Sequence, residues 1–252
     1  MPLLRRRIHP TPLKLLRTAT RGPLGQGAWF VNAAAGVQVG TPWFDPRHWR
    51  ERGAVFGEHM GRGTTLAFEH AGRRYLLRHY RRGGLISRFN HDSYLWLGES
   101  RTRSLEELRL TLLLHAAGLP VPRPIAARYE QSGALYRADI ITEYLPGTAT
   151  LAERLEHEEV GLQTWAAIGR CIRTFHDHGL CHADLNAHNI LLRGDEEVFV
   201  IDFDRASRRS KPGLWKDANL ARLRRSLDAL EDRRPERRFD DAQWQCLLAA
   251  WL

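Results

Sequence analysis

The sequence predicts an α+β fold with two lobes, a β-rich amino-terminal lobe and a mainly helical carboxyl-terminal lobe. Short, glycine-punctuated apolar segments typical of strands begin at residue 55, and helical periodicity dominates after residue 146. At 252 residues, the chain is long enough to bury a sizeable core, and a single two-lobed domain spanning 1–252 is the natural arrangement. We divide it into an irregular segment (1–54), an N-lobe (55–145) and a C-lobe (146–252).

The amino-terminal part offers little regular patterning before residue 55. Residues 1–54 mix Gly, Pro and Trp with weak periodicity, which predicts irregular structure with an occasional short strand. Residues 66–68 and 74–78 then predict a hairpin that turns at Ala71 and Gly72. Gly61 and Gly63 precede this hairpin, where their backbone N–H groups are able to approach phosphate oxygens closely. Their spacing is not G-x-G-x-x-G, and taken alone they are equally well explained as ordinary hairpin glycines.

A leucine-rich helix and an apolar strand complete the predicted N-lobe. Residues 104–115 place leucines at helical spacing, with Ser104 as the expected N-cap and Glu107 three positions later, a capping-box pattern. Gly118 and Pro120 end this helix. An apolar strand over 138–142 then leads to Glu143 and the segment that connects the two lobes.

The C-lobe is predicted to contain three helices and one short hairpin. The helices span 151–162, 164–178 and 219–230. The hairpin pairs 190–192 with 198–201 around the turn signal Gly194-Asp195. In the last helix the leucines share one side, which predicts packing against the lobe; direct contact with lipid is the less favoured alternative.

Three polar residues bracket this hairpin at a spacing typical of phosphoryl transfer. Asp184 is a carboxylate that accepts the proton of an attacking hydroxyl, while Asn189 and Asp202 offer oxygen ligands suited to Mg²⁺. A single Asp or Asn here is well explained as a turn residue. Three of them in register before and after two apolar strands favour catalysis, so the sequence predicts ATP-dependent phosphorylation with Asp184 as base.

Composition constrains the partners and the compartment. The formal net charge of +9 favours an acidic partner. Cys171, Cys181 and Cys246 lack paired spacing, which indicates neither a disulfide framework nor a zinc site and fits a reducing cytoplasm. No apolar run approaches the roughly 20 residues of a membrane span, so we expect a soluble or peripheral protein. No RNP-like or zinc-finger pattern indicates nucleic acid as a partner.

Six sequence motifs together resemble the lipopolysaccharide-kinase branch of the protein-kinase-like superfamily, in particular its members that act on 3-deoxy-D-manno-octulosonic acid (Kdo). These motifs are GRGTT (61–65), LRHYRRGG (77–84), GLPVPRP (118–124), HADLNAHNILL (182–192), IDFDRA (201–206) and NLARLRRSL (219–227). The resemblance implies a protein-kinase-like fold and transfer of the ATP γ-phosphate to a hydroxyl of a Kdo sugar on a lipid A precursor. It also implies a peripheral location on the anionic cytoplasmic face of the bacterial inner membrane.

The resemblance also assigns roles to individual residues. Asp184 matches the catalytic aspartate, Asn189 and Asp202 the metal ligands, Glu107 the helix glutamate that pairs with a strand cation, and Glu143 the connecting segment that meets adenine. Glu106 is the alternative to Glu107. Arg78 stands where kinases carry Lys, and no Lys occurs between 14 and 211. Arg grips phosphate and stays charged, although a solvated basic face that includes Arg81 and Arg82 is the competing explanation for Arg78.

Two departures disfavour a peptide acceptor. Ala183 replaces the Arg that in many protein kinases contacts a phosphorylated activation loop, and no A-P-E segment follows Asp204. Only 48 residues (252 − 204) follow Asp204, which leaves little room for peptide-docking helices. The alternatives that stay open are another small-molecule kinase of this architecture, acting on heptose or an aminoglycoside, and a catalytically silent basic module that binds anionic glycolipid or nucleic acid.

Overall fold

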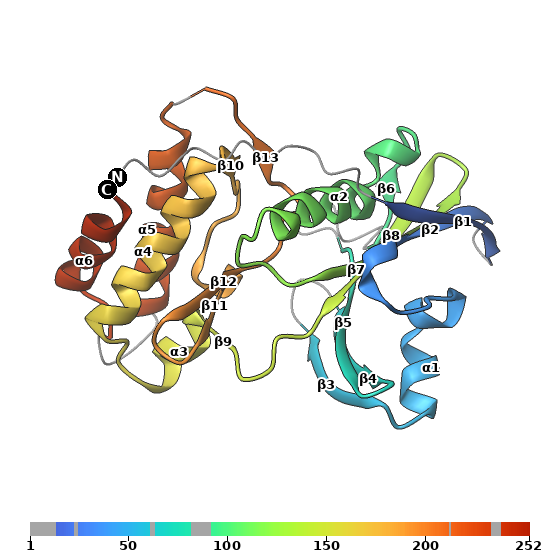
Figure 1. The fold of residues 1–252 in the computed structure, drawn as a ribbon, viewed down its shortest axis with the longest axis horizontal. Helices are drawn as coiled ribbons and strands as arrows, with labels where there is room; N and C mark the ends of the chain where they lie inside the picture. Colours follow the sequence, from blue (N-terminus) through green and yellow to red (C-terminus); the bar gives the residue numbers. More distant parts are fainter. Residues whose placement is uncertain (1–13, 23–24, 61–63, 82–91, 212, 233–237) are drawn as a thin grey trace. The chain divides into compact units, whose positions relative to one another are not determined.

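The computed structural model describes residues 14–22, 25–60, 64–81, 92–211, 213–232 and 238–252 (Figure 1). These residues form two compact units. The β unit comprises the described residues of 14–115 and 122–145, and the helical unit comprises those of 116–121 and 146–252. The predicted α+β class, with a β-rich part followed by a mainly helical part, is therefore confirmed.

The β unit is built on one antiparallel sheet. Its strands follow the order β1-β2-β7-β8-β5-β4-β3, and β6 pairs with β8. The strands are β1 (Leu15–Gly22), β2 (Gly25–Asn32), β3 (Val55–Met60), β4 (Thr64–His70), β5 (Arg73–His79), β6 (Tyr94–Leu95), β7 (Pro124–Ser132) and β8 (Leu135–Glu143). The predicted hairpin around Ala71-Gly72 is the β4–β5 pair.

The prediction of an irregular segment over 1–54 is wrong for residues 15–32. β1 and β2 pair along their whole length, and β2 continues the sheet through β7. The glycines of these two segments disfavoured the prediction of strands, because Gly is depleted in strands. A Cβ atom at Gly27 would lie 2.4 Å from the Tyr129 carbonyl oxygen, so glycine allows β2 to approach β7 closely. Helix α1 (Pro46–Glu51) also forms within this segment, after the 3₁₀ turns η1 (Ala33–Ala35) and η2 (Thr41–Phe44).

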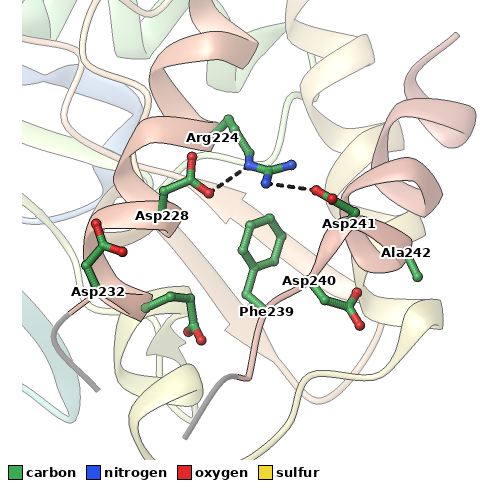
Figure 2. Close-up of a pocket in the computed structure, with 8 residues that line it drawn as sticks. Arg224, Asp228, Asp232, Phe239, Asp240, Asp241 and Ala242 are labelled. Carbon is green, nitrogen blue, oxygen red and sulfur yellow. Dashed lines mark hydrogen bonds and ion pairs between the residues drawn. The ribbon is translucent and has the colours of Figure 1, made fainter. Parts of the chain in front are cut away.

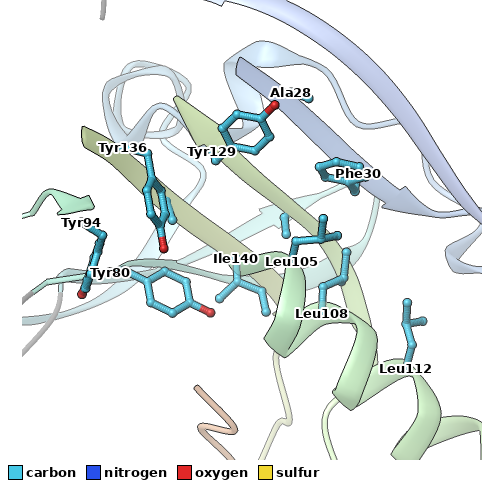
Figure 3. Packing of buried hydrophobic residues seen from close by; sticks show 12 residues of the cluster. Ala28, Phe30, Tyr80, Tyr94, Leu105, Leu108, Leu112, Tyr129, Tyr136 and Ile140 are labelled. Atoms are coloured by element: carbon cyan, nitrogen blue, oxygen red, sulfur yellow. The ribbon is translucent and has the colours of Figure 1, made fainter. Parts of the chain in front are cut away.

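Each face of the sheet carries its own apolar cluster. One cluster joins tyrosines and small residues of the sheet to Leu105, Leu108 and Leu112 of helix α2 (Arg103–Ala116), as Figure 3 shows. The other is aromatic, and its centre is Trp49 stacked on Phe68 with ring centroids 4.0 Å apart. Because both faces are covered, the sheet forms a stable platform for side chains at its strand ends.

The start of α2 differs from the predicted capping box. The backbone N–H groups of Leu105 and Glu106 both donate to Thr102 O, so the helix begins at Arg103 and its N-cap is Thr102, two residues before the expected Ser104. The 3₁₀ turn η4 (Glu99–Arg101) precedes it. Ser104 lies inside the first turn and donates its hydroxyl to Arg128 O at 2.9 Å. The serine therefore anchors α2 to strand β7 instead of capping the helix.

Within its described residues, the helical unit consists of four helices, five short strands and one 3₁₀ turn. The helices are α3 (Leu151–His157), α4 (Leu162–Asp177), α5 (Trp215–Glu231) and α6 (Asp241–Trp251). The strands are β9 (Ala149–Thr150), β10 (Leu180–Cys181), β11 (Ile190–Arg193), β12 (Glu197–Val200) and β13 (Ser207–Arg208), and η5 (Ala187–Asn189) is a 3₁₀ turn.

The hairpin β11–β12 is the one predicted, and β9 pairs with its β11 edge. The helix expected over 151–162 is shorter than predicted and ends at His157. Val160 is fully buried, and its carbonyl oxygen accepts hydrogen bonds from the Trp165 indole N–H (3.0 Å) and the Gln243 amide (3.2 Å). These contacts hold the chain outside a helix between α3 and α4.

Close packing fixes the remaining helices. In α4, a Cβ atom at Gly169 would lie 2.2 Å from Leu247 O of α6, so glycine permits the contact between these helices. In α5, Leu220, Leu223 and Leu227 are buried, as the leucine spacing predicts. Within the described part of the chain, no helix is long and apolar enough to cross a bilayer.

Candidate active site

The loop between β10 and β11 carries the predicted catalytic residues, and its backbone is fixed at both ends. The His182 N–H donates to Asn219 Oδ1 of α5 at 3.0 Å, and a His182 ring nitrogen, Nε2, lies 2.9 Å from Ile201 O. Since a carbonyl oxygen only accepts, Nε2 carries the proton. At the other end, the Ala187 N–H donates to the Ser226 hydroxyl at 3.2 Å. The loop is thus bound to α5 and to the segment that follows β12.

Asp184 is held by hydrogen bonds to both its backbone and its side chain. Its carbonyl oxygen accepts from the side-chain amides of Asn189 (2.9 Å) and Asn186 (3.0 Å). Its Oδ1 atom accepts from Arg222 Nε at 2.7 Å and also from Arg222 Nη2, and Asn186 Nδ2 lies 3.3 Å away. The Asp184 side chain is 31% exposed, so solvent or an incoming group reaches it.

Asn189 and Asp202 lie at adjoining ends of the hairpin. The Ile201 N–H donates to Asn189 O at 3.1 Å, which continues the pairing of Ile190 with Val200. Asp202 has φ +66°, in the left-handed region that non-glycine residues seldom adopt. A residue held in this conformation indicates a local requirement for its side-chain direction, which is frequent at functional sites. The structure therefore brings together the two residues predicted as metal ligands.

The chemistry of these two side chains fits Mg²⁺. The Asn189 amide is buried and donates through Nδ2, so its Oδ1 atom is the one that could bind a metal ion, and Asp202 could add a carboxylate oxygen. Mg²⁺ prefers such oxygen ligands and takes one or two carboxylates together with water and substrate phosphates. The described residues contain no cluster of three or more His, Cys, Asp or Glu side chains able to hold a metal ion on its own.

In the β unit, Arg78 of β5 forms an ion pair with Glu107 of α2. The Tyr80 hydroxyl donates to the same Glu107 carboxylate, and the Arg78 guanidinium lies 4.9 Å from the Tyr80 ring centroid. The Glu107 side chain is only 6% exposed and that of Arg78 22%. Glu106, the alternative partner, is exposed. The pairing of a strand cation with a helix glutamate thus forms with Glu107, and Arg78 is not simply part of a solvated face.

The opposite face of β5 carries a second charged group. His79 Nδ1 lies 2.7 Å from Asp139 Oδ1, and Arg128 Nη2 lies 2.7 Å from Asp139 Oδ2. Burial alone would lower the pKa of His79, but Asp139 and then Asp92 outweigh it and raise that pKa. Burial would likewise raise the pKa of Asp139, but Arg128 and His79 outweigh it and lower that pKa. This network joins β5, β7 and β8.

Of the other predicted nucleotide-binding residues, the structure describes Glu143 but neither of the two glycines. Glu143 ends β8, and its N–H donates to Arg123 O at 2.9 Å, so its backbone is fixed where the β unit ends. Gly61 and Gly63 lie outside the described residues. Each half of the site is described within its own unit: Arg78, Glu107 and Glu143 in the β unit, and Asp184, Asn189 and Asp202 in the helical unit.

Sequence reasoning missed Arg222 and Tyr80. Arg222 lies away from the leucine side of the helix predicted over 219–230, and its guanidinium binds Asp184. The signal available was spacing: Asn219, Arg222 and Ser226 stand at i, i+3 and i+7, which is one face of a helix. Tyr80 follows Arg78 by two positions and so shares its side of the strand.

A separate hollow between α5 and α6 does not contain the predicted site residues (Figure 2). There Arg224 bridges Asp228 and Asp241, each at 2.8 Å, and its guanidinium lies 5.2 Å from the Phe239 ring centroid. The pair with Asp228 lies within α5 and the pair with Asp241 links α5 to α6, so we interpret this hollow as part of the helix packing and not as the active site.

Comparison with known proteins identifies the family of the chain. The family model described as lipopolysaccharide kinase (Kdo/WaaP) matches residues 47–251. A 3-deoxy-D-manno-octulosonic acid kinase of Stenotrophomonas maltophilia (strain K279a) is 43% identical over 226 residues, which cover 90% of this chain and 89% of the relative.

Relatives from other genera carry the same name. The 3-deoxy-D-manno-octulosonic acid kinase of Actinobacillus succinogenes is 41% identical over 84% of this chain and 90% of its own length. That of Xylella fastidiosa (strain M23) is 44% identical over 80% of each chain. With a family match from residue 47 to residue 251 and such relatives over most of its length, the chain belongs to the lipopolysaccharide kinase (Kdo/WaaP) family.

Proposed function

We propose that this protein transfers the γ-phosphoryl group of ATP to a hydroxyl of a Kdo residue carried on a lipid A precursor. Membership in a lipopolysaccharide kinase family makes the chain a phosphotransferase with a hydroxyl acceptor. The relatives named 3-deoxy-D-manno-octulosonic acid kinase support Kdo as the acceptor sugar. The observation that carries the proposal is the arrangement of Asp184, Asn189 and Asp202 around one hairpin.

In this reaction Asp184 orients the acceptor hydroxyl and takes its proton. The acceptor oxygen forms a bond to the γ-phosphorus, the bond between that phosphorus and the β–γ bridging oxygen breaks, and ADP leaves with the electron pair. Asp184 is suited to this step because its carboxylate is anchored and still reachable from solvent. Proton transfer ends on its carboxylate.

Asn189 and Asp202 would hold Mg²⁺, which neutralises charge on the phosphates during transfer. Arg78 would bind ATP phosphate, with Glu107 and Tyr80 fixing the direction of its guanidinium. Gly61 and Gly63 are proposed to contact the phosphates and Glu143 to lie beside adenine. A guanidinium is a planar fork of N–H donors and an ammonium is a point charge, so the replacement of Lys by Arg keeps the charge and changes the geometry.

The acceptor that we propose is also compatible with the charge of the chain. A Kdo-bearing lipid A precursor carries phosphate and carboxylate groups, and the chain has a net charge of +9. We therefore propose that the protein acts as a peripheral protein at the anionic cytoplasmic face of the inner membrane. Release of the protein from anionic vesicles by salt would test this part of the proposal, because the attraction is screened at high ionic strength.

The acceptor is tested by offering several in parallel. Purified protein with Mg²⁺ and ATP is incubated with a Kdo-bearing lipid A precursor, a heptose-bearing lipopolysaccharide core and an aminoglycoside, and phosphorylated products are identified by mass spectrometry. We expect phosphate on the Kdo residue. Phosphate on heptose or on the aminoglycoside alone would replace the proposed acceptor, and binding of the glycolipid without any phosphorylated product would support a silent binding module.

A further inference from the structure

Helix α5 contacts the catalytic loop through three polar side chains on one face. Asn219 accepts from the His182 N–H, Arg222 binds the Asp184 carboxylate, and Ser226 accepts from the Ala187 N–H. The i, i+3 and i+7 spacing places all three on one stripe of the helix. Buried Leu223 and Leu227 fix the helix beside this stripe. Two of the three contacts bind backbone; the Arg222 contact alone reaches the side chain predicted as the base.

The bonds to the Asp184 carboxylate are distributed unequally between its two oxygens. Arg222 Nε (2.7 Å), Arg222 Nη2 and Asn186 Nδ2 (3.3 Å) all donate to Oδ1. Among the described residues, none donates to Oδ2. One oxygen is therefore held by protein donors, and the other accepts no hydrogen bond from the described residues, on a side chain that is 31% exposed.

We propose that Arg222 is a positioning residue for the phosphoryl transfer, which anchors Asp184 through Oδ1 so that Oδ2 receives the acceptor proton. This inference rests on the proposed function. As the acceptor oxygen bonds to phosphorus, its O–H bond breaks and the proton passes to Oδ2, while Arg222 stays bound to Oδ1. Arg222 therefore acts through Asp184.

A guanidinium suits this role better than an ammonium. Arg222 uses two N–H groups on one oxygen, which fixes both the distance and the direction of the carboxylate, whereas a Lys side chain acts as a point charge. No residue of the loop between Asp184 and Asn189 is a Lys or an Arg, so the cation for this carboxylate comes from α5.

The competing interpretation is that the ion pair only ties α5 to the loop. The Arg222 side chain is 42% exposed, and exposed pairs contribute little to stability. A tie of this kind would leave the rate of transfer unchanged. Direct binding of an anionic group of the acceptor by Arg222 is a second alternative, and it would act on the KM of the acceptor. Steady-state kinetics separate these cases.

The experiment compares Arg222→Ala and Arg222→Lys with Arg225→Ala in the full chain. Arg225 is an exposed arginine of the same helix, and its replacement is the matched control. With Mg²⁺, ATP and the Kdo-bearing lipid A precursor, we expect Arg222→Ala to lower kcat about 100-fold, within the range for general base catalysis, and to leave both KM values within about twofold. Arg222→Lys should recover part of the loss, and Arg225→Ala should match the wild type.

A double-variant comparison provides the readout that a structural tie would not change. Under single-turnover conditions, adding Arg222→Ala to Asp184→Asn should lower the residual rate by less than about threefold, because the residue acts through Asp184. An unchanged kcat in Arg222→Ala would overturn the inference. A raised acceptor KM with unchanged kcat would also overturn it and would assign Arg222 to acceptor binding.

Failure of the proposed function has a different signature. If the wild type does not phosphorylate the Kdo-bearing precursor, the acceptor is wrong, and the same variants are compared by ADP release with water as acceptor. In this hydrolysis of ATP, Asp184 orients the attacking water molecule. A lower rate of ADP release in Arg222→Ala than in the wild type supports the inference, and an equal rate contradicts it. The melting temperature of each variant is measured as a control, to confirm that the variants are folded under the conditions of the kinetic assay.

Discussion

Arg78 of strand β5 binds Glu107 of helix α2, and the Tyr80 hydroxyl donates to the same carboxylate. Two side chains, those of Glu107 and Tyr80, thus fix the guanidinium of Arg78, which lies on a strand inside the sheet between β8 and β4. The lysine expected at this place in a kinase is absent, and its pairing is kept by arginine. The consequence for ATP can be measured.

Arg78→Ala should chiefly weaken the use of ATP. Removing a charged donor from a bound phosphate costs about 1.5–3 kcal/mol, so we expect the KM for ATP to rise about 10- to 100-fold. Arg74→Ala is the matched control, since Arg74 lies on the same strand in an exposed pair with Glu69. An unchanged ATP dependence in Arg78→Ala would show that the pair with Glu107 is structural only.

Asp202→Asn should abolish most activity without unfolding the protein. Asn tolerates the left-handed backbone that Asp202 adopts at φ +66°, so the turn is preserved while the charged ligand is lost. We expect the Mg²⁺ concentration for half-maximal activity to rise, and chelation of Mg²⁺ to stop the wild-type reaction. If the variant shows the wild-type Mg²⁺ dependence, Asp202 is not a metal ligand.

How much of this site was predictable depends on whether its residues are neighbours in sequence. Asp184, Asn189 and Asp202 lie within 19 positions around one hairpin, so spacing alone predicts their meeting. The contact of Arg222 with Asp184 spans 38 positions and depends on the direction in which α5 packs, which local spacing does not specify. Strands β1 and β2 were missed for a related reason, because Gly25 and Gly27 satisfy a close approach to β7 that appears only in the folded sheet.

Gly169→Ala should destabilise the helical unit although Ala favours helix. The added Cβ atom would lie 2.2 Å from Leu247 O, and a backbone atom moves only if α6 shifts. Overpacking of this kind costs about 1–3 kcal/mol, against about 1 kcal/mol gained in helix propensity. Chemical denaturation would measure the loss. Gly161→Ala is the control, because nothing lies within 4 Å of the added atom, and equal stability of the two variants would contradict the packing described for α4 and α6.

The pH dependence of stability should report the network of His79 and Asp139. The pKa of His79 is raised on folding, so its contribution is fully present below the unfolded pKa of about 6.5 and is lost as the pH rises through the folded value. We expect the unfolding midpoint of the wild type to fall relative to that of His79→Asn as the pH rises above about 6.5.

Asp139 acts at the other end of the pH range. Its lowered pKa gives a contribution that is present above the unfolded value of about 3.9 and is lost as the pH falls through the folded value. Above pH 6.5, Asp139 is ionised in both proteins, so the difference in unfolding midpoint between the wild type and His79→Asn reports the titration of His79. If the midpoints of the two proteins change in parallel above pH 6.5, the ion pair between His79 and Asp139 does not form in solution.

The central claim is that Asp184 activates the acceptor hydroxyl, and Asp184→Asn tests it most directly. The measurement is transfer of labelled γ-phosphate from ATP to a Kdo-bearing lipid A precursor by the purified wild type and the variant. The wild type should label the lipid, and the variant, which keeps the shape of the side chain but loses the base, should be slower by at least about 100-fold. Equal labelling by the two proteins would contradict the assignment of Asp184.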